Sequence, residues 1–193
     1  MVSIFQSLYK TIIAGLILLF ILIVIVGHPT EYGSDWILFF VRWLHVVSGI
    51  MWVGLLWYFN FVQIPTMPKI PDDQKPAISK FIAPEALFWF RYAALSTVIT
   101  GLLVALLNGY IVEALSLNAP FVAIGIGMWF AIVMAYNVWF ILWPNQKKAL
   151  GIVEVSWDEK TKAAKYAMIT SRVNALLSIP MLYMMVAQSH GGI

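Results

Sequence analysis

The chain has 193 residues, of which 62% are hydrophobic and 11% are charged, and its mean hydropathy is +0.86. Soluble domains are about half apolar and a quarter charged, so this composition excludes an ordinary soluble domain and indicates an integral membrane protein. The net charge of +3 fits the positive-inside bias of membrane loops, and we expect no nucleic acid partner. The absence of cysteine excludes disulfides, iron–sulfur clusters and covalent c-type haem.

The first predicted helix covers about residues 9–27. An unbroken run of Ile, Leu, Val and Phe follows Lys10, and it is long enough to span a bilayer. A cleaved signal peptide is the competing interpretation, but it requires a small-residue cleavage site. The polar turn that begins at His28 contains no such site, so we predict a retained membrane helix.

The second predicted helix, about 36–64, collects polar residues on one face. At about 100° per residue, its ionisable and amide side chains share a narrow stripe. The stripe consists of Arg42, His45, Gly49, Trp52, Leu56, Asn60 and Gln63. Ionisable groups at membrane depth are costly and usually face a bundle interior or a site. His45 is therefore our starting point for function.

Three further helices bring the expected number of spans to five. They are predicted at about 85–112, 120–143 and 169–189. The fold class is then all-α: an integral membrane helical bundle, with residues 1–193 as a single transmembrane domain.

Prolines and charges define the predicted connections. The segment from Pro65 to Pro84 contains five prolines and several charges, which is typical of a rigid loop outside the bilayer. Pro144 is predicted to end the fourth helix, and residues 149–168 to form a solvated, partly helical loop.

Arg91 lies within the first two turns of the third predicted helix. Two interpretations are open. The side chain either snorkels to the membrane interface or pairs with an anionic group of a ligand, and we include Arg91 among the candidate cofactor-binding residues.

Basic residues predict the orientation of the chain. Lysines gather before the first helix and in the second and fourth loops, whereas the first and third loops contain acidic residues and neither Lys nor Arg. By the positive-inside rule, the N-terminus is expected in the cytoplasm and the C-terminus, with His190, in the periplasm of a bacterial cytoplasmic membrane.

The three histidines all fall in the outer half of this topology. Without cysteine, the cofactor that suits imidazoles in an apolar bundle is a non-covalent haem b. Gly49, one turn from His45, leaves room for a flat ring, and Arg42 lies one turn nearer the outer surface, where propionates would point. On the last helix, Tyr183 and His190 share a face.

Other interpretations of His45 stay open at this point. A histidine in a transmembrane helix often only forms a hydrogen bond with a neighbouring helix. Copper binding through histidine and the scattered methionines is a further possibility. The sequence contains no nucleophile triad, paired-carboxylate site or phosphate loop, so a hydrolase is not expected.

Three blocks of sequence resemble a known family. They are RWLHVVSGIMWVG with WYF after it, VWFILWPNQKK, and RVNALLSIPMLYMMVAQSH. These blocks resemble the membrane domain of the bacterial membrane-bound urate hydroxylases (the PuuD-like, urate oxidase N-terminal family) and, more distantly, haem b membrane proteins of the HemJ and CopD types. The resemblance implies that His45 and His190 are metal ligands, with Arg42 and Trp52 beside the first.

The resemblance and the residues together predict a function. Family members carry a C-terminal cytochrome c domain with C-x-x-C-H, whereas this sequence has no cysteine. We expect a membrane protein that binds haem b and carries out electron transfer or redox chemistry. It would pass electrons to a separate cytochrome c or oxidase. The alternative is a non-catalytic accessory subunit that stabilises a larger respiratory or oxygenase complex.

Overall fold

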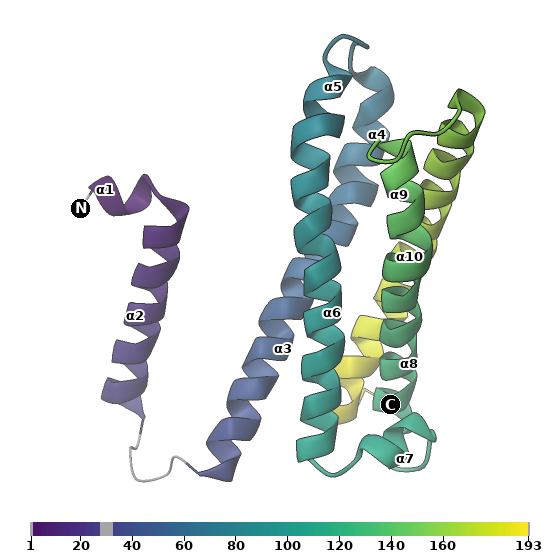
Figure 1. The fold of residues 1–193 in the computed structure, drawn as a ribbon. Helices are drawn as coiled ribbons and strands as arrows, with labels where there is room; N and C mark the ends of the chain where they lie inside the picture. The colour runs from purple at the N-terminus through teal and green to yellow at the C-terminus, as the bar shows by residue number, and fades with distance from the viewer. Residues whose placement is uncertain (1, 28–32, 193) are drawn as a thin grey trace. The chain divides into compact units, whose positions relative to one another are not determined.

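The computed structural model describes residues 2–27 and 33–192, and its helices are drawn in Figure 1. Every regular element among these residues is helical. Five helical runs are long and apolar enough to cross a membrane: Leu8–Val26, Asp35–Lys69, Lys75–Leu107, Val122–Ala149 and Trp157–His190. An all-helical chain with five candidate spans is therefore confirmed.

The chain divides into two compact units, Met1–Phe39 and Phe40–Ile193. The first contains α1 (Val2–Phe5), α2 (Leu8–Val26) and the first turns of α3 (Ser34–Trp57). The Thr11 hydroxyl, near the start of α2, donates to the carbonyl of Ile4 in α1. No residue of α2 is buried, so beyond Thr11 this helix offers an apolar surface. His28 lies outside the described residues.

The second unit consists of four long helical runs and one short helix. The first run continues α3 through η2 (Tyr58–Gln63), α4 (Ile64–Thr66) and η3 (Met67–Lys69). The second joins α5 (Lys75–Ala77), η4 (Ile78–Ile82) and α6 (Ala83–Leu107), and the short α7 (Ile111–Leu115) follows. The third joins α8 (Val122–Tyr136), η5 (Asn137–Leu142) and α9 (Trp143–Ala149), and the fourth is α10 (Trp157–His190).

Successive runs of the second unit point in opposite directions (Figure 1). One end carries the connections at residues 70–74 and 150–156 and most of the lysines; we call it the lysine-rich end. The other, called the opposite end, carries the connection at 108–121 and the last turn of α10. The position of each candidate site residue along the bundle is given by the end to which it lies nearer.

The helices extend well beyond the predicted boundaries at the lysine-rich end. The expected loop from Pro65 to Pro84 is wrong, because only residues 70–74 separate the first two runs. Pro144 does not end a helix, since it lies in the first turn of α9. The last helix begins at Trp157 rather than near 169.

A recurring π-helical turn explains how these prolines are accommodated. Proline lacks an N–H group, and in an α-helix its ring clashes with the carbonyl of residue i−4. Here the residue before each proline closes a wider turn: Ile64 donates to Phe59, Ala83 to Ile78 and Trp143 to Val138. In a π turn a carbonyl accepts a hydrogen bond from the N–H of residue i+5 rather than i+4. The carbonyl four residues before the proline therefore does not depend on the N–H group that proline lacks.

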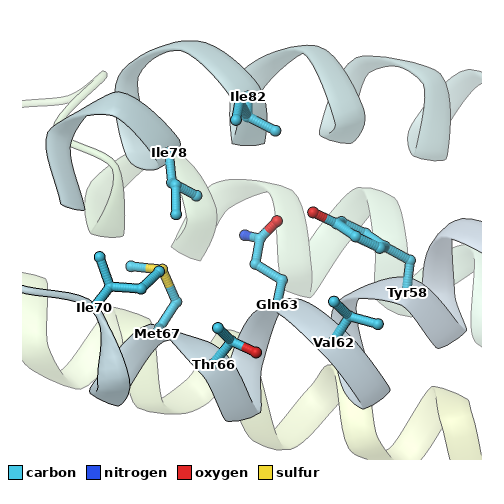
Figure 2. A pocket seen from close by; sticks show the side chains of 8 residues that line it. All are labelled: Tyr58, Val62, Gln63, Thr66, Met67, Ile70, Ile78 and Ile82. Atoms are coloured by element: carbon cyan, nitrogen blue, oxygen red, sulfur yellow. The ribbon is translucent and has the colours of Figure 1, made fainter. Parts of the chain in front are cut away.

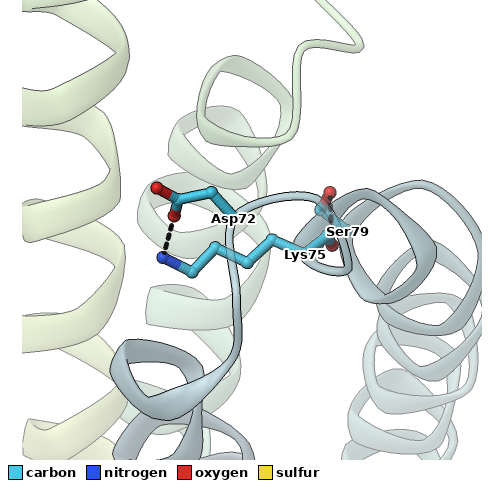
Figure 3. Close-up of polar contacts among 3 residues, drawn as sticks. All are labelled: Asp72, Lys75 and Ser79. Carbon is cyan, nitrogen blue, oxygen red and sulfur yellow. Dashed lines mark hydrogen bonds and ion pairs between the residues drawn. The ribbon is translucent and has the colours of Figure 1, made fainter.

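The short connection at the lysine-rich end is closed by an ion pair (Figure 3). The Lys75 ammonium lies 2.6 Å from Asp72 Oδ1, and the Ser79 hydroxyl donates to the Lys75 carbonyl at 3.2 Å. The hydrogen bond from Lys75 lowers the pKa of the Asp72 carboxyl. Because this carboxylate is exposed, the pair fixes the turn and adds little stability.

The core of the second unit is built from large side chains contributed by all four runs. Trp52 and Leu56 of α3 are fully buried against residues of α6, α8, η5 and α10. The largest fully buried side chains are Trp52, Phe90, Leu56, Met134, Leu142, Val138, Asn174 and Ser178. Two of these eight, Asn174 and Ser178, are polar, so the interior of the bundle contains polar groups as well as apolar ones.

Candidate functional site

A polar seam joins α3 to α6 in the half of the bundle nearest the opposite end. Nδ1 of His45 lies 2.9 Å from the Thr97 carbonyl and 3.3 Å from the Thr100 hydroxyl. One turn further along, the Ser48 and Ser96 hydroxyls lie 2.8 Å apart. The His45 ring is thus held against α6 through Nδ1.

These contacts determine the tautomer of His45. A carbonyl oxygen only accepts hydrogen bonds, so Nδ1 must carry the proton that Thr97 receives. The Thr100 hydroxyl donates to the Ser96 carbonyl at 2.6 Å and can accept from the same Nδ1–H. In the neutral ring, Nε2 therefore keeps its lone pair, and no residue in the described part of the chain forms a hydrogen bond with it. Metal-ligating histidines show this arrangement.

Gly101 of α6 supports the His45 ring from behind. A Cβ atom at this position would lie 2.8 Å from Cε1 and 3.1 Å from Nδ1 of His45, so a larger residue would force the imidazole to shift. Gly49 faces α6 less closely, and its Cβ would lie 3.8 Å from Thr97. The sequence predicted that Gly49 leaves room for a flat haem ring, and this stays a prediction; Gly101 is the glycine in contact with the imidazole.

Arg42 and Trp52 lie on either side of His45 along α3. The Arg42 guanidinium donates to Asn108 Oδ1 at 3.4 Å, at the end of α6, so Arg42 lies at the opposite end of the bundle. Trp52 is fully buried, and its indole N–H has no hydrogen-bond partner among the described residues. The seam therefore contains the His45 imidazole, the Arg42 guanidinium near the opposite end of the bundle and the buried indole N–H donor of Trp52.

His190 and Tyr183 belong to the end of α10. His190 is exposed, and its Nδ1 lies 3.2 Å from the Val186 carbonyl of its own helix. The Tyr183 hydroxyl donates to the Gly192 carbonyl at 2.7 Å, which holds the chain end in place. The hydrogen bonds of His190 and His45 share no residue, and His190 as the second ligand stays a prediction.

Arg91 is buried among the helices of the bundle, and the snorkelling interpretation stays a prediction. Only 8% of its surface is exposed, and its guanidinium carbon lies 3.4 Å from the centre of the Trp143 ring. The α6 residues that contact His45 or Ser48 are Ser96, Thr97, Thr100 and Gly101. Arg91 therefore lies outside that seam.

A second polar layer, nearer the lysine-rich end, joins α10 to its neighbours. Asn174 is fully buried; its amide donates to the Met134 carbonyl at 2.9 Å and accepts from Asn137 at 2.8 Å. Asn60 donates to the Ser171 hydroxyl at 2.9 Å. The sequence marked Asn60 as part of the stripe but did not show that its partner comes from α10.

A pocket of about 100 Å³ lies between the first two runs near the lysine-rich end. Figure 2 shows its lining, with the amide of Gln63 and the hydroxyl of Tyr58 turned toward the space between the helices. The remaining lining residues are Val62, Thr66, Met67, Ile70, Ile78 and Ile82. The pocket is mostly apolar and is separate from the His45 seam.

These features define an all-helical chain with five candidate membrane spans and a half-buried imidazole at a helix seam. Residues 102–192 match the model of the urate oxidase N-terminal family, which confirms the resemblance to that family for this part of the chain. The match includes Tyr183 and His190, and His45 lies before it. No curated protein and no solved structure matches the chain significantly.

Proposed function

We propose that this chain is a five-pass protein of the bacterial cytoplasmic membrane that binds haem b non-covalently and takes part in electron transfer. Electrons would come from a quinol or a small reductant and leave to a separate cytochrome c or oxidase. The observation that carries the proposal is the bond from His45 Nδ1 to the Thr97 carbonyl at 2.9 Å, because it leaves Nε2 as the lone-pair nitrogen.

The residues of the seam fit a haem in their chemistry. His45 would supply an axial nitrogen, and Arg42, at the opposite end, would neutralise a propionate. Haem supplies one-electron chemistry when its iron is held by histidine. The hydrogen bond from His45 to Thr97 would hold the imidazole orientation and leave Nε2 as the lone-pair nitrogen, and the apolar side chains around Trp52 would exclude water.

The orientation follows from the charges of the second unit. Lysines flank the connections at 70–74 and 150–156, so this end is proposed to face the cytoplasm. The four runs contain 28 to 35 residues, whereas about 20 residues span the hydrocarbon core. The surplus, up to about 20 Å per helix, would extend into the cytoplasm. Reporter fusions at both termini test this topology, and finding both on the same side would contradict it.

A non-catalytic accessory subunit is the second candidate. Interhelical hydrogen bonds support this candidate, because His45, Ser48 and Asn60 each form one with another helix. In this interpretation the three residues serve only to pack the helices together. The discriminating experiment is an absorption spectrum of protein purified after expression with an adequate haem supply. A Soret band supports the haem protein, and its absence supports the accessory subunit.

Gly101→Ala tests whether the His45 position matters. The added methyl group would displace the imidazole and break its bond to Thr97, so we expect a loss of about 1–3 kcal/mol in unfolding free energy and a lower haem content. Thermal unfolding in detergent and the Soret absorbance per protein measure these two effects.

Gly49→Ala is the matched control on the facing helix. Its Cβ would meet Thr97 at an ordinary contact distance of 3.8 Å, so the unfolding free energy should stay near that of the wild type, and a fall in haem content would support the predicted role of Gly49 in leaving room for the ring. Equal behaviour of the two variants would show that the packing behind His45 is not critical.

A further inference from the structure

Arg91 is a buried cation without a counter-ion. With 8% exposure, it forms no hydrogen bond or ion pair with any described residue, and its NH1 nitrogen is fully enclosed and unpartnered. The two ion pairs among the described residues use Lys75 with Asp72 and Lys148 with Glu159. No carboxylate of the described chain therefore compensates the charge of Arg91.

Such an arrangement is costly unless a partner is supplied. A guanidinium does not lose its proton in proteins, and burying a charge without a partner costs several kcal/mol. Arg172, in contrast, is exposed on α10 and can be solvated. Stacking on Trp143 offsets part of the desolvation cost of Arg91, but it leaves the N–H donors in the plane of the guanidinium without acceptors.

The surroundings of Arg91 contain a second positive charge. The Lys147 ammonium lies 5.5 Å from the centre of the same Trp143 ring, so two cations lie near one indole. A negatively charged group would be attracted by both cations.

The depth of Arg91 indicates from which side such a group would arrive. Arg91 precedes the end of α6 at Leu107 by sixteen residues, or about 24 Å at 1.5 Å per residue. The hydrocarbon core is about 30 Å thick. If Leu107 marks its outer edge, Arg91 lies close to the lysine-rich boundary, at the level where aromatic residues and headgroups meet.

We propose that Arg91, with Lys147 beside it on the Trp143 ring, binds an oxyanion at the lysine-rich face of the bundle. The planar fork of the guanidinium suits a phosphate or carboxylate group through paired hydrogen bonds. The oxyanion belongs either to a lipid headgroup or to a small soluble molecule. This site uses no residue of the His45 seam and is independent of haem binding.

The experiment compares thermal unfolding of the full chain in detergent micelles. In micelles of an uncharged maltoside detergent, which contains no phosphate, inorganic phosphate or acetate is titrated at constant ionic strength; in a second arm, phosphatidylglycerol is added to the micelles. A saturable rise in Tm of about 5 °C in the first arm identifies a soluble anion, and a rise only in the second identifies a lipid phosphate.

Two variants decide whether Arg91 is responsible. Arg91→Met should remove the rise in either arm, while the exposed Arg172→Met should keep it. If Arg91→Met does not accumulate, Arg91→Lys replaces it and should weaken the rise, since an ammonium cannot pair in a planar fork. No saturable rise in the wild type, or an equal loss in Arg172→Met, would overturn the proposal.

Discussion

Protein carrying His45→Ala is expected to be purified without haem, whereas the wild type shows a Soret band. His45 is the half-buried imidazole of the seam, and its Nδ1–H donates to the Thr97 carbonyl, which leaves Nε2 to bind iron. Alanine removes that nitrogen without placing a larger group against Gly101. The Soret absorbance per protein, after expression with added haem, measures the effect.

Ser48→Ala is the matched control for this experiment. It removes the 2.8 Å contact between Ser48 and Ser96 one turn away but takes away no potential ligand, so haem should be retained. Full haem occupancy in His45→Ala would refute the proposed ligand. A colourless wild type would instead support the accessory subunit.

The spectrum of His190→Ala then decides on a second ligand. If His190 also binds the iron, this variant should keep its haem but change from a low-spin to a high-spin spectrum. His190 is exposed, and its Nδ1 contacts the Val186 carbonyl of its own helix, so Nε2 is the nitrogen that would bind the iron. An unchanged low-spin spectrum would remove His190 alone from the site.

The five spans could be predicted because apolar length is a property of each segment by itself. The ends of the helices could not. Pro65, Pro84 and Pro144 were expected to stop or precede helices, since proline breaks an α-helical hydrogen bond. The π turns that relieve each proline depend on how the backbone adapts to its neighbours, and residue type alone does not indicate them.

The candidate site shows the same division between local and long-range information. The helical periodicity placed Arg42, His45 and Trp52 on one face, and that face lies against other helices. The contact between His45 and Gly101 joins residues far apart in the sequence, so no spacing rule could find it. The burial of Arg91 was missed for the same reason, because Trp143, which covers it, comes from another helix.

Gly125→Ala is expected to be the most destabilising of the glycine substitutions considered. Gly125 lies in the first turn of α8, where a Cβ would approach the Ala114 carbonyl oxygen of α7 to 2.0 Å. Because this neighbour is backbone, no side-chain rotation relieves the clash, and α7 must move. Overpacking typically costs about 1–3 kcal/mol and sometimes more. We expect about 3 kcal/mol here, or a fall in Tm of about 6–12 °C.

The displacement should also reach the end of α10. Gln188 donates to the Pro120 carbonyl at 3.0 Å and accepts from the Ile124 N–H at 3.3 Å, so it ties α10 to the residues just before Gly125. Gly54→Ala is the control, since its Cβ would meet no atom of the described chain within 4 Å. Alanine favours a helix by about 1 kcal/mol over glycine, so the Tm of Gly54→Ala should stay level or rise. A wild-type Tm for Gly125→Ala in detergent would show that α7 can separate from α8 at little cost, and that this contact does not hold the opposite end of the bundle.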